Sequence, residues 1–209
     1  CVVVAVVVAV VLRRGGGRFG ESWLLPDRLH VEAMSIVPRV FVFDLDNCCW
    51  TPEMYQMSSG APFTYDEKQN ACTTKGGREQ VRLLGDVPAV WNAIRNDPRF
   101  QGSQIAVASC CDEPAWAREL LGLFQVEDGA KMSTCIAHCE IRFGNKQAHL
   151  RNIAQKLNVA LEDMVFFDDQ SGHVRDAKAL GVTAVQVPHG GVTNAAFGQA
   201  LEDFANRRR

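Results

Sequence analysis

The stretch "VFVFDLDNCCW", from Val40 to Trp50, joins an apolar run to two aspartates and then to two adjacent cysteines. Residues 40–43 are apolar and partly β-branched, which predicts a buried β-strand. Asp44 and Asp46 follow at the point where that strand ends. In an open parallel sheet, ligands bind beyond the carboxyl ends of the strands. The two aspartates are therefore the first candidates for functional side chains.

Apolar runs and helical patterns alternate along the rest of the chain. The sequence predicts further buried strands at residues 105–108, 136–141, 164–167 and 183–187. It predicts helices at residues 86–96, 112–124, 146–157, 174–180 and 193–205, the last capped by Thr193. This alternation indicates an α/β fold, a Rossmann-like parallel sheet with helices on both faces.

The composition is that of a soluble globular protein. The chain has 209 residues, of which 47% are hydrophobic and 22% charged, and its formal net charge is -2. A chain this long forms one domain with a sizeable core, and its charge gives no reason to expect a nucleic-acid partner. The eight cysteines lack the paired spacing of a zinc site, so we expect free thiols in a reducing, cytoplasmic compartment. We expect a monomer, with no membrane association of the core domain.

Two segments, residues 1–33 and residues 51–85, do not follow the alternation of strands and helices. Residues 1–33 hold a short valine- and alanine-rich run followed by arginines and glycines, and we place them outside the core domain at 34–209. They are either a truncated targeting or anchor segment or the product of non-native translation. Residues 51–85 are rich in turn formers, and Gly76-Gly77 predicts a hairpin, a flap over the two aspartates.

Other polar residues stand at the ends of the predicted strands. Ser109 follows the second strand, Asp168 and Asp169 follow the fourth, and Lys146 opens a helix. Each alone is compatible with a turn, a cap or a surface position, but together they predict one site. Converging carboxylates require a cation, and all-oxygen ligands suit Mg²⁺. Such a site supports attack of a carboxylate on phosphorus, with a second acid to protonate the leaving alcohol.

Taken with these motifs, the sequence resembles the haloacid dehalogenase superfamily, and within it the magnesium-dependent phosphatase-1 family. The resemblance rests on "VFDLDNCCW", "GREQVRLLGDVP", "VAS", "GNKQAH", "FFDDQ" and "DAKALGVT", which run from about residue 40 to about residue 191. It implies a Rossmann-like (HAD-like) domain with a small β-hairpin cap, and hydrolysis of phosphomonoesters such as protein phosphotyrosine or sugar phosphates.

The resemblance also implies roles for single residues. Asp44 is the nucleophile, Asp46 the acid and base, and Lys146 neutralises charge beside them. Leu45, Ser109 and Cys110 hold the position of phosphoryl contacts, and Lys146 completes that set. Mg²⁺ is implied to bind Asp44, the backbone carbonyl of Asp46, and Asp168 or Asp169. A weakened phosphate-binding protein and a phosphoryl transferase are the alternatives to a phosphatase.

Two positions depart from the family pattern. Cys48 stands where Thr is usual and Cys110 where Arg is usual, and neither thiol matches the hydrogen bonding of the residue it replaces. Lys75, Arg78 or Arg82 of the flap are candidates for the missing positive charge. We expect the cysteines to be packing residues, and a reversible disulfide between the loops that carry them is the alternative.

Overall fold

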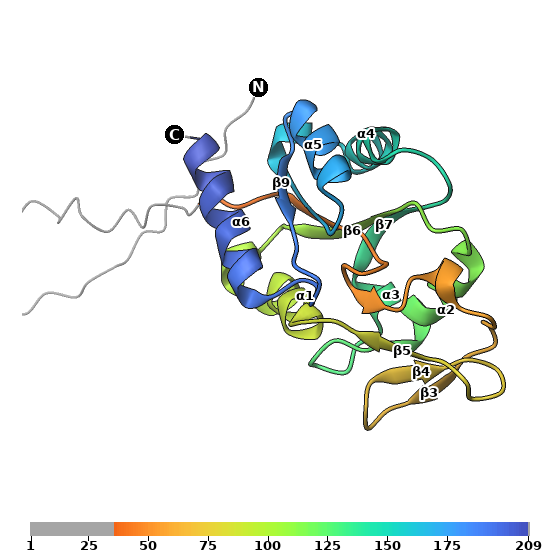
Figure 1. Ribbon diagram of the computed structural model, residues 1–209. Coiled ribbons are helices and arrows are strands. Elements are labelled where there is room, and N and C mark those ends of the chain that lie inside the picture. Colours follow the sequence, from red (N-terminus) through yellow and green to blue (C-terminus); the bar gives the residue numbers. More distant parts are fainter. Residues whose placement is uncertain (1–35, 209) are drawn as a thin grey trace, which may run out of the picture. The chain divides into compact units, whose positions relative to one another are not determined.

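A central parallel sheet organises the protein, whose computed structural model describes residues 36–208 (Figure 1). Five strands lie in the order β7-β6-β1-β8-β9, so that the first strand of the chain occupies the middle. β1 is buried at every residue because it has a neighbour on each side and helices on each face. The strands are β1 (Val40–Phe43), β6 (Gln104–Ser109), β7 (Ile136–Ile141), β8 (Met164–Asp168) and β9 (Thr183–Gln186).

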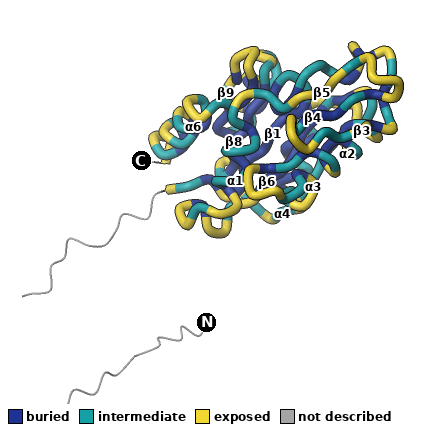
Figure 2. The backbone as a smooth tube through the Cα atoms, turned by 90° about the horizontal axis from the view of Figure 1, so that it is seen from below, coloured by how far each residue is buried: buried dark blue, intermediate teal, exposed yellow. Residues whose placement is uncertain are grey.

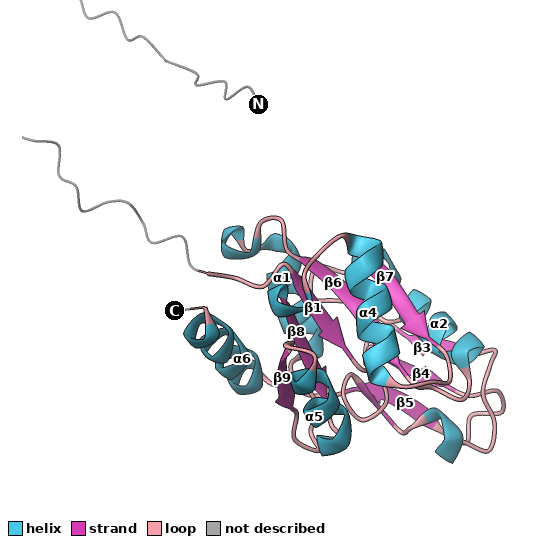
Figure 3. Cartoon of the chain, turned by 90° about the horizontal axis from the view of Figure 1, so that it is seen from above, coloured by secondary structure: helices cyan, strands magenta, loops and turns pink. Residues whose placement is uncertain are grey.

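Helices cover both faces of this sheet, as Figure 3 shows. Phe41 and Phe43 of β1 pack in one core cluster with residues of α1, α2 and α6, whereas Val40 and Val42 pack in a second cluster with α4 and α5. Alternate residues of a strand point to opposite faces, so one short strand serves both layers. The helices are α1 (Val87–Asn96), α2 (Pro114–Leu123), α3 (Met132–Cys135), α4 (Lys146–Leu157), α5 (Ser171–Ala179) and α6 (Asn194–Arg207), and short 3-10 turns lie at η2 (Pro98–Phe100) and η3 (Leu161–Asp163).

The burial pattern follows from these layers. The inner strands β6, β1 and β8 are almost wholly buried, the edge strands β7 and β9 are partly exposed, and other exposed residues gather on the outer sides of the helices and on the loops (Figure 2). The strand and helix order predicted from the sequence is confirmed. The other predicted boundaries lie within two residues of the observed ones, but α5 begins at Ser171 and not at residue 174, and the short α3 was not predicted. The first turn of α5 is polar, and before it the backbone N–H of Gln170 donates to Asp168 Oδ1.

The segment between β1 and α1 folds as a small antiparallel sheet, which we call the cap sheet. Its strands, β2 (Trp50–Thr51), β3 (Thr64–Asp66), β4 (Ala71–Thr73) and β5 (Gln80–Leu83), lie in the order β2-β5-β4-β3. The predicted Gly76-Gly77 turn joins β4 to β5, and both glycines have positive φ angles. The prediction of a single hairpin was too simple, since four short strands pair.

The cap sheet lies beside the central sheet, and it is not confined to the space over Asp44 and Asp46 where the flap was predicted. The backbone N–H of Phe63 donates to Glu119 of α2 at 2.7 Å, and Asn70 donates to the carbonyl of Gln125 at 2.8 Å. These bonds tie its outer strands to the α2 side of the domain. The 3-10 turn η1 (Met54–Gln56), between β2 and β3, is the part of the cap segment that borders the strand ends.

The described residues, 36–208, belong to one compact unit. The predicted role of residues 1–33 lies outside the described residues. Within 36–208, no helix combines the length and the apolar character needed to cross a membrane.

Candidate active site

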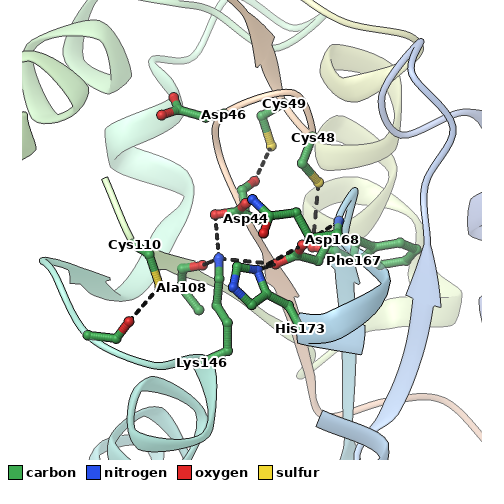
Figure 4. Close-up of polar contacts among 12 residues, drawn as sticks. Asp44, Asp46, Cys48, Cys49, Ala108, Cys110, Lys146, Phe167, Asp168 and His173 are labelled. Carbon is green, nitrogen blue, oxygen red and sulfur yellow. Dashed lines mark hydrogen bonds and ion pairs between the residues drawn. The ribbon is translucent and has the colours of Figure 1, made fainter. Parts of the chain in front are cut away.

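The functional residues predicted from the sequence meet at the carboxyl edge of the central sheet (Figure 4). Asp44 follows β1, Ser109 ends β6 and Asp168 ends β8, while Lys146 is the first residue of α4. Parallel strands deliver their carboxyl ends to one edge, which is why residues separated by more than a hundred positions share one pocket.

Lys146 lies at the centre of this group. Its side chain is only 1% exposed, and its Nζ lies 2.6 Å from Asp44 Oδ1 and 3.1 Å from Asp168 Oδ2. The same ammonium donates to the carbonyl of Ala108 at 2.7 Å. Burial opposes the charge of Lys146, but the fields of Asp44 and Asp168 prevail and raise its pKa. One buried cation therefore faces two carboxylates, and the group keeps an excess of negative charge.

Three carboxylates at this edge are arranged as a cation site. Oxygens of Asp44, Asp168 and Asp169 lie within 4.8 Å of one another. Asp169 Oδ1 is buried and has no hydrogen-bond partner among residues 36–208, which is costly unless a ligand satisfies it. Burial, followed by the charges of Asp168 and Asp44, raises the pKa of Asp169 to about 6. A hard cation with oxygen ligands, such as Mg²⁺, fits this donor set.

Asp168 is held in its ionised form by neighbours on α5 and α4. His173 Nδ1 lies 3.2 Å from both carboxylate oxygens, and the backbone N–H of Gln170 donates to Oδ1 at 2.8 Å. Burial opposes ionisation, but these bonds and the Lys146 ammonium hold the pKa of Asp168 below its usual value. Asp168 is thus a fixed anionic group at the floor of the site.

Asp46 lies in the same pocket but has different partners. Trp50 Nε1 donates to its Oδ1 at 2.7 Å, and the backbone N–H of Met54 donates to its Oδ2 at 3.2 Å. Burial raises the pKa of this carboxyl to about 6, although both hydrogen bonds act to lower it. Asp44 and Asp46 are therefore distinct groups, one paired with an ammonium and one held by neutral N–H donors.

The pocket above these groups has walls from both parts of the domain. Ser109 and Cys110 line it from the β6 side, and Glu53 and Tyr55 line it from η1 and the residue before it. Tyr55 is 64% exposed, so its ring stands at the mouth. The side chain of Leu45 is fully buried in the core, so a phosphoryl contact from this residue requires its backbone. Its carbonyl already accepts from the N–H groups of residues 48–50.

The cysteines that depart from the family pattern take different positions. Cys48 is buried, and its Sγ donates to the carbonyl of Phe167 at 3.5 Å, on the β8 side of β1. Cys110 is partly exposed in the pocket, and its Sγ donates to the carbonyl of Gly144 at 3.2 Å. Both are free thiols bonded to different carbonyls, which favours packing residues over a disulfide between them.

The proposed replacement for the missing arginine was wrong. Lys75, Arg78 and Arg82 are not among the described residues that line the pocket. Lys75 and Arg78 lie in the turn between β4 and β5, beside which the backbone N–H groups of Ser58 and Ser59 donate to Glu79. In the described part of the chain, the cap segment contributes Glu53 and Tyr55 to the pocket lining, and Trp50 and Met54 donate to Asp46.

Sequence reasoning missed His173, the two donors to Asp46, and the pocket wall at Glu53 and Tyr55. The position of His173 had a signal, because a histidine in the first turn of the helix after Asp168 faces back toward the strand end. The two hydrogen bonds to Asp46 had no signal in the sequence, because they depend on how the cap segment folds and on the rotamer of Trp50.

Comparisons with known proteins identify relatives of this chain. The sequence profile of the family described as Acid Phosphatase matches residues 36–207. Magnesium-dependent phosphatase 1 of Homo sapiens is 32% identical over 173 residues, which cover 82% of this chain and 90% of that protein. A HAD-like hydrolase superfamily protein of Schizosaccharomyces pombe is 26% identical over 152 residues, covering 71% of this chain and 85% of that protein.

A solved structure has the same fold. A HAD-superfamily hydrolase from Ehrlichia chaffeensis superposes with a TM-score of 0.52 and 8% identity, covering 83% of this chain and 98% of that chain. At this identity the likeness concerns the fold alone.

Proposed function

Because the chain belongs to the acid phosphatase family within the haloacid dehalogenase superfamily, we propose that it is a Mg²⁺-dependent phosphomonoester hydrolase acting through an aspartyl-phosphate on Asp44. One observation carries the proposal. Asp44 ends the central strand with its Oδ1 2.6 Å from Lys146 Nζ, in a cluster with Asp168 and Asp169. A carboxylate so placed is a nucleophile whose charge is compensated on one side only.

The first half of the reaction forms the acyl-phosphate. Asp44 attacks phosphorus, the bond from phosphorus to the leaving oxygen breaks, and Asp46 gives its proton to that oxygen. Lys146 and the hydroxyl of Ser109 hold the phosphoryl oxygens. Mg²⁺ would be held by Asp44, the backbone carbonyl of Asp46, and Asp168 or Asp169, and would offset repulsion between the nucleophile and the phosphate dianion.

The second half regenerates the enzyme. Asp46, now a carboxylate, takes a proton from water, and the oxygen of that water attacks phosphorus. The bond between phosphorus and Asp44 breaks, and inorganic phosphate leaves. A raised pKa of about 6 suits Asp46 for both directions of proton transfer near neutral pH.

Mg²⁺ and the substrate class are each supported by further observations. The relative from Homo sapiens carries magnesium dependence in its name, and the oxygen-only donor set of this chain suits the same ion. The pocket is bordered by one 3-10 turn of the cap segment, and its exposed Tyr55 leaves room for a large leaving group. We therefore include protein phosphotyrosine and sugar phosphates among its substrates.

The test is Mg²⁺-dependent phosphate release from 4-nitrophenyl phosphate by the purified chain and by Asp44→Asn. We expect the variant to lose at least about 10²-fold in rate, because an amide neither attacks phosphorus nor binds Mg²⁺ well. In the active enzyme, borohydride during turnover should reduce the acyl-phosphate and convert Asp44 to homoserine, which peptide mass spectrometry detects. An active Asp44→Asn enzyme would contradict the mechanism.

Two other functions remain testable in the same assay. A phosphate-binding protein weakened by Cys48 and Cys110 would bind phosphate analogues without turnover. A phosphoryl transferase would need an added acceptor alcohol before the ester is consumed. The pocket opens to solvent at Cys110 and Tyr55, which favours water as the acceptor.

A further inference from the structure

The carboxylate of Asp46 is fixed at both oxygens by the cap segment. Trp50 Nε1 donates to Oδ1 at 2.7 Å, and the backbone N–H of Met54 donates to Oδ2 at 3.2 Å. Two donors on two oxygens determine the direction of the carboxyl plane as well as its position. Each oxygen retains a second lone pair, which is free to carry a transferable proton.

The indole that makes the shorter bond is itself rigid. Trp50 is fully buried, it pairs with Leu83 of β5, and its ring packs on Phe124 at a centroid distance of 6.0 Å. Its carbonyl also accepts from the backbone N–H of Asn47 at 2.8 Å. A side chain held by strand pairing and by a ring on the opposite side cannot change rotamer freely. The orientation of Asp46 is therefore set by the cap sheet.

We propose that Trp50 is a positioning residue for the leaving-group acid, whose Nε1–H orients the carboxyl of Asp46 for proton delivery to the departing oxygen. This inference rests on the proposed function, in which the bond from phosphorus to that oxygen breaks as Asp44 bonds to phosphorus. The proton of Asp46 moves to the oxygen that leaves. Trp50 is not among the described residues that line the pocket, so it acts through Asp46.

A positioning role of Trp50 makes the rate depend on the leaving group in a way that a purely structural role would not. A 4-nitrophenolate leaves phosphorus readily without a proton, whereas phenolate and alkoxides are poor leaving groups that need one. Loss of acid orientation should therefore slow esters of weakly acidic alcohols much more than 4-nitrophenyl phosphate. General damage to the fold would slow all esters alike.

The experiment measures kcat/KM of the full chain with Mg²⁺ for 4-nitrophenyl, phenyl and alkyl phosphates, in wild type and Trp50→Phe. We expect Trp50→Phe to lose at least about 10-fold more with phenyl and alkyl phosphate than with 4-nitrophenyl phosphate. Trp91→Phe is the matched control. Trp91 is also fully buried, but within residues 36–208 its Nε1 has no hydrogen-bond partner, so its effect should be equal across the series.

Two further measurements keep the test decisive. In an Asp46→Asn background, Trp50→Phe should add no leaving-group dependence, because the group it orients is gone. If Trp50→Phe does not fold, benzothienylalanine at position 50 keeps the shape of the indole and removes only the N–H. It should reproduce the steeper dependence on the leaving group.

The possible results distinguish a failure of the proposed phosphatase function from a failure of the proposed role of Trp50. A wild type that releases no phosphate from any ester with Mg²⁺ overturns the proposed function. An active wild type whose Trp50 variants keep the same leaving-group dependence overturns only the role of Trp50, as does an effect that persists in full without Asp46.

Discussion

Two adjacent acids acquire different chemistry from the groups that contact them. Asp44 lies against a buried ammonium, whereas Asp46 accepts from an indole and a backbone N–H, and burial raises its pKa to about 6. Burial raises the pKa of Asp44 as well, but the Lys146 ammonium opposes that shift, whereas Asp46 has only neutral donors. At the scale of single residues, two aspartates that are only two positions apart thus have different electrostatic surroundings.

Cys110 offers a direct test of the phosphate contact. Its thiol lies in the pocket wall and donates to Gly144, and a thiol binds phosphate poorly. Cys110→Arg would add a planar cation at the mouth. We expect KM for small phosphomonoesters to fall with little change in kcat, since a contact made equally in ground and transition states changes KM alone. Steady-state kinetics of both enzymes check this, with Cys110→Ser as the control; a KM that stays the same or rises would count against it.

His149 makes stability depend on pH. The residue is fully buried on α4, neither ring nitrogen has a partner in the described part of the chain, and burial, followed by Arg142 and Lys146, lowers its pKa to about 4. The unfolded chain, with a pKa near 6.5, binds more protons than the folded chain between pH 6.5 and 4. Stability linked to His149 is therefore present at neutral pH and is lost as pH falls through this window.

His149→Phe removes that titration and keeps an aromatic ring at the same buried position. From pH 7 to pH 5, wild type should lose about 2 kcal/mol of unfolding free energy relative to the variant. Urea unfolding at several pH values checks the difference between the two proteins. A constant difference between pH 7 and 5 would show that the imidazole is not held neutral by the fold.

At the scale of elements, the central sheet was predictable because its strands are continuous apolar runs. β1 was predicted at residues 40–43 and lies there, since neighbours on both sides and helices on both faces allow no polar residue within it. The candidate site followed from the same rule, because strand ends of a parallel sheet share one edge. Local sequence carried enough information for both.

The cap sheet and the start of α5 could not be predicted in the same way. β2, β3 and β4 are two or three residues long, too short for a clear alternating pattern, and β2 exists through pairing with β5, some thirty residues further along the chain. Ser171 and Gly172 open α5 without an apolar face, so no periodicity marks its first turn. The bond from Trp50 to Asp46 could not be predicted for the same reason as the cap sheet, because Trp50 lies in β2.

The loop before α6, at residues 191 and 192, contacts both the segment after β1 and the segment after β5. Val192 donates to the carbonyl of Cys48, and Gly191 has a φ of +80° with that same carbonyl against it. A Cβ at position 191 would lie 2.7 Å from the Cys48 oxygen and 2.4 Å from Leu84 Cβ. Neither neighbour can move without shifting the loops that follow β1 and β5.

Gly191→Ala should therefore destabilise the fold by more than backbone strain alone. We expect a loss of roughly 3 kcal/mol or more in unfolding free energy, from a positive φ together with overpacking. Gly77→Ala is the matched control, with a φ of +71° and open space around its Cβ, and should cost about 1 kcal/mol. Urea unfolding of both variants gives the comparison, and equal losses would show that the contact at Gly191 is not tight.

At the scale of the whole molecule, the described core begins a few residues before β1. Val37 packs on the first core cluster, and Arg39 donates its backbone N–H to Asp163 at 2.8 Å before β1 begins. The compact unit starts at Ser35, and both core clusters and all the candidate site residues lie within it. We therefore propose that residues 1–33 contribute neither to the core nor to catalysis.

A chain that begins at Met34 should fold and turn over 4-nitrophenyl phosphate as the full chain does. It retains every strand of the central sheet, so its unfolding free energy should agree within about 0.5 kcal/mol. A chain that begins at Val42 is the control, because it lacks Val40 and Phe41, one buried residue from each face of the central strand. Losing two such side chains costs several kcal/mol, a large share of the stability of a domain. Urea unfolding and kcat/KM of the three proteins test the boundary; an inactive or insoluble Met34 chain beside an active full-length chain would place residues 1–33 inside the functional unit.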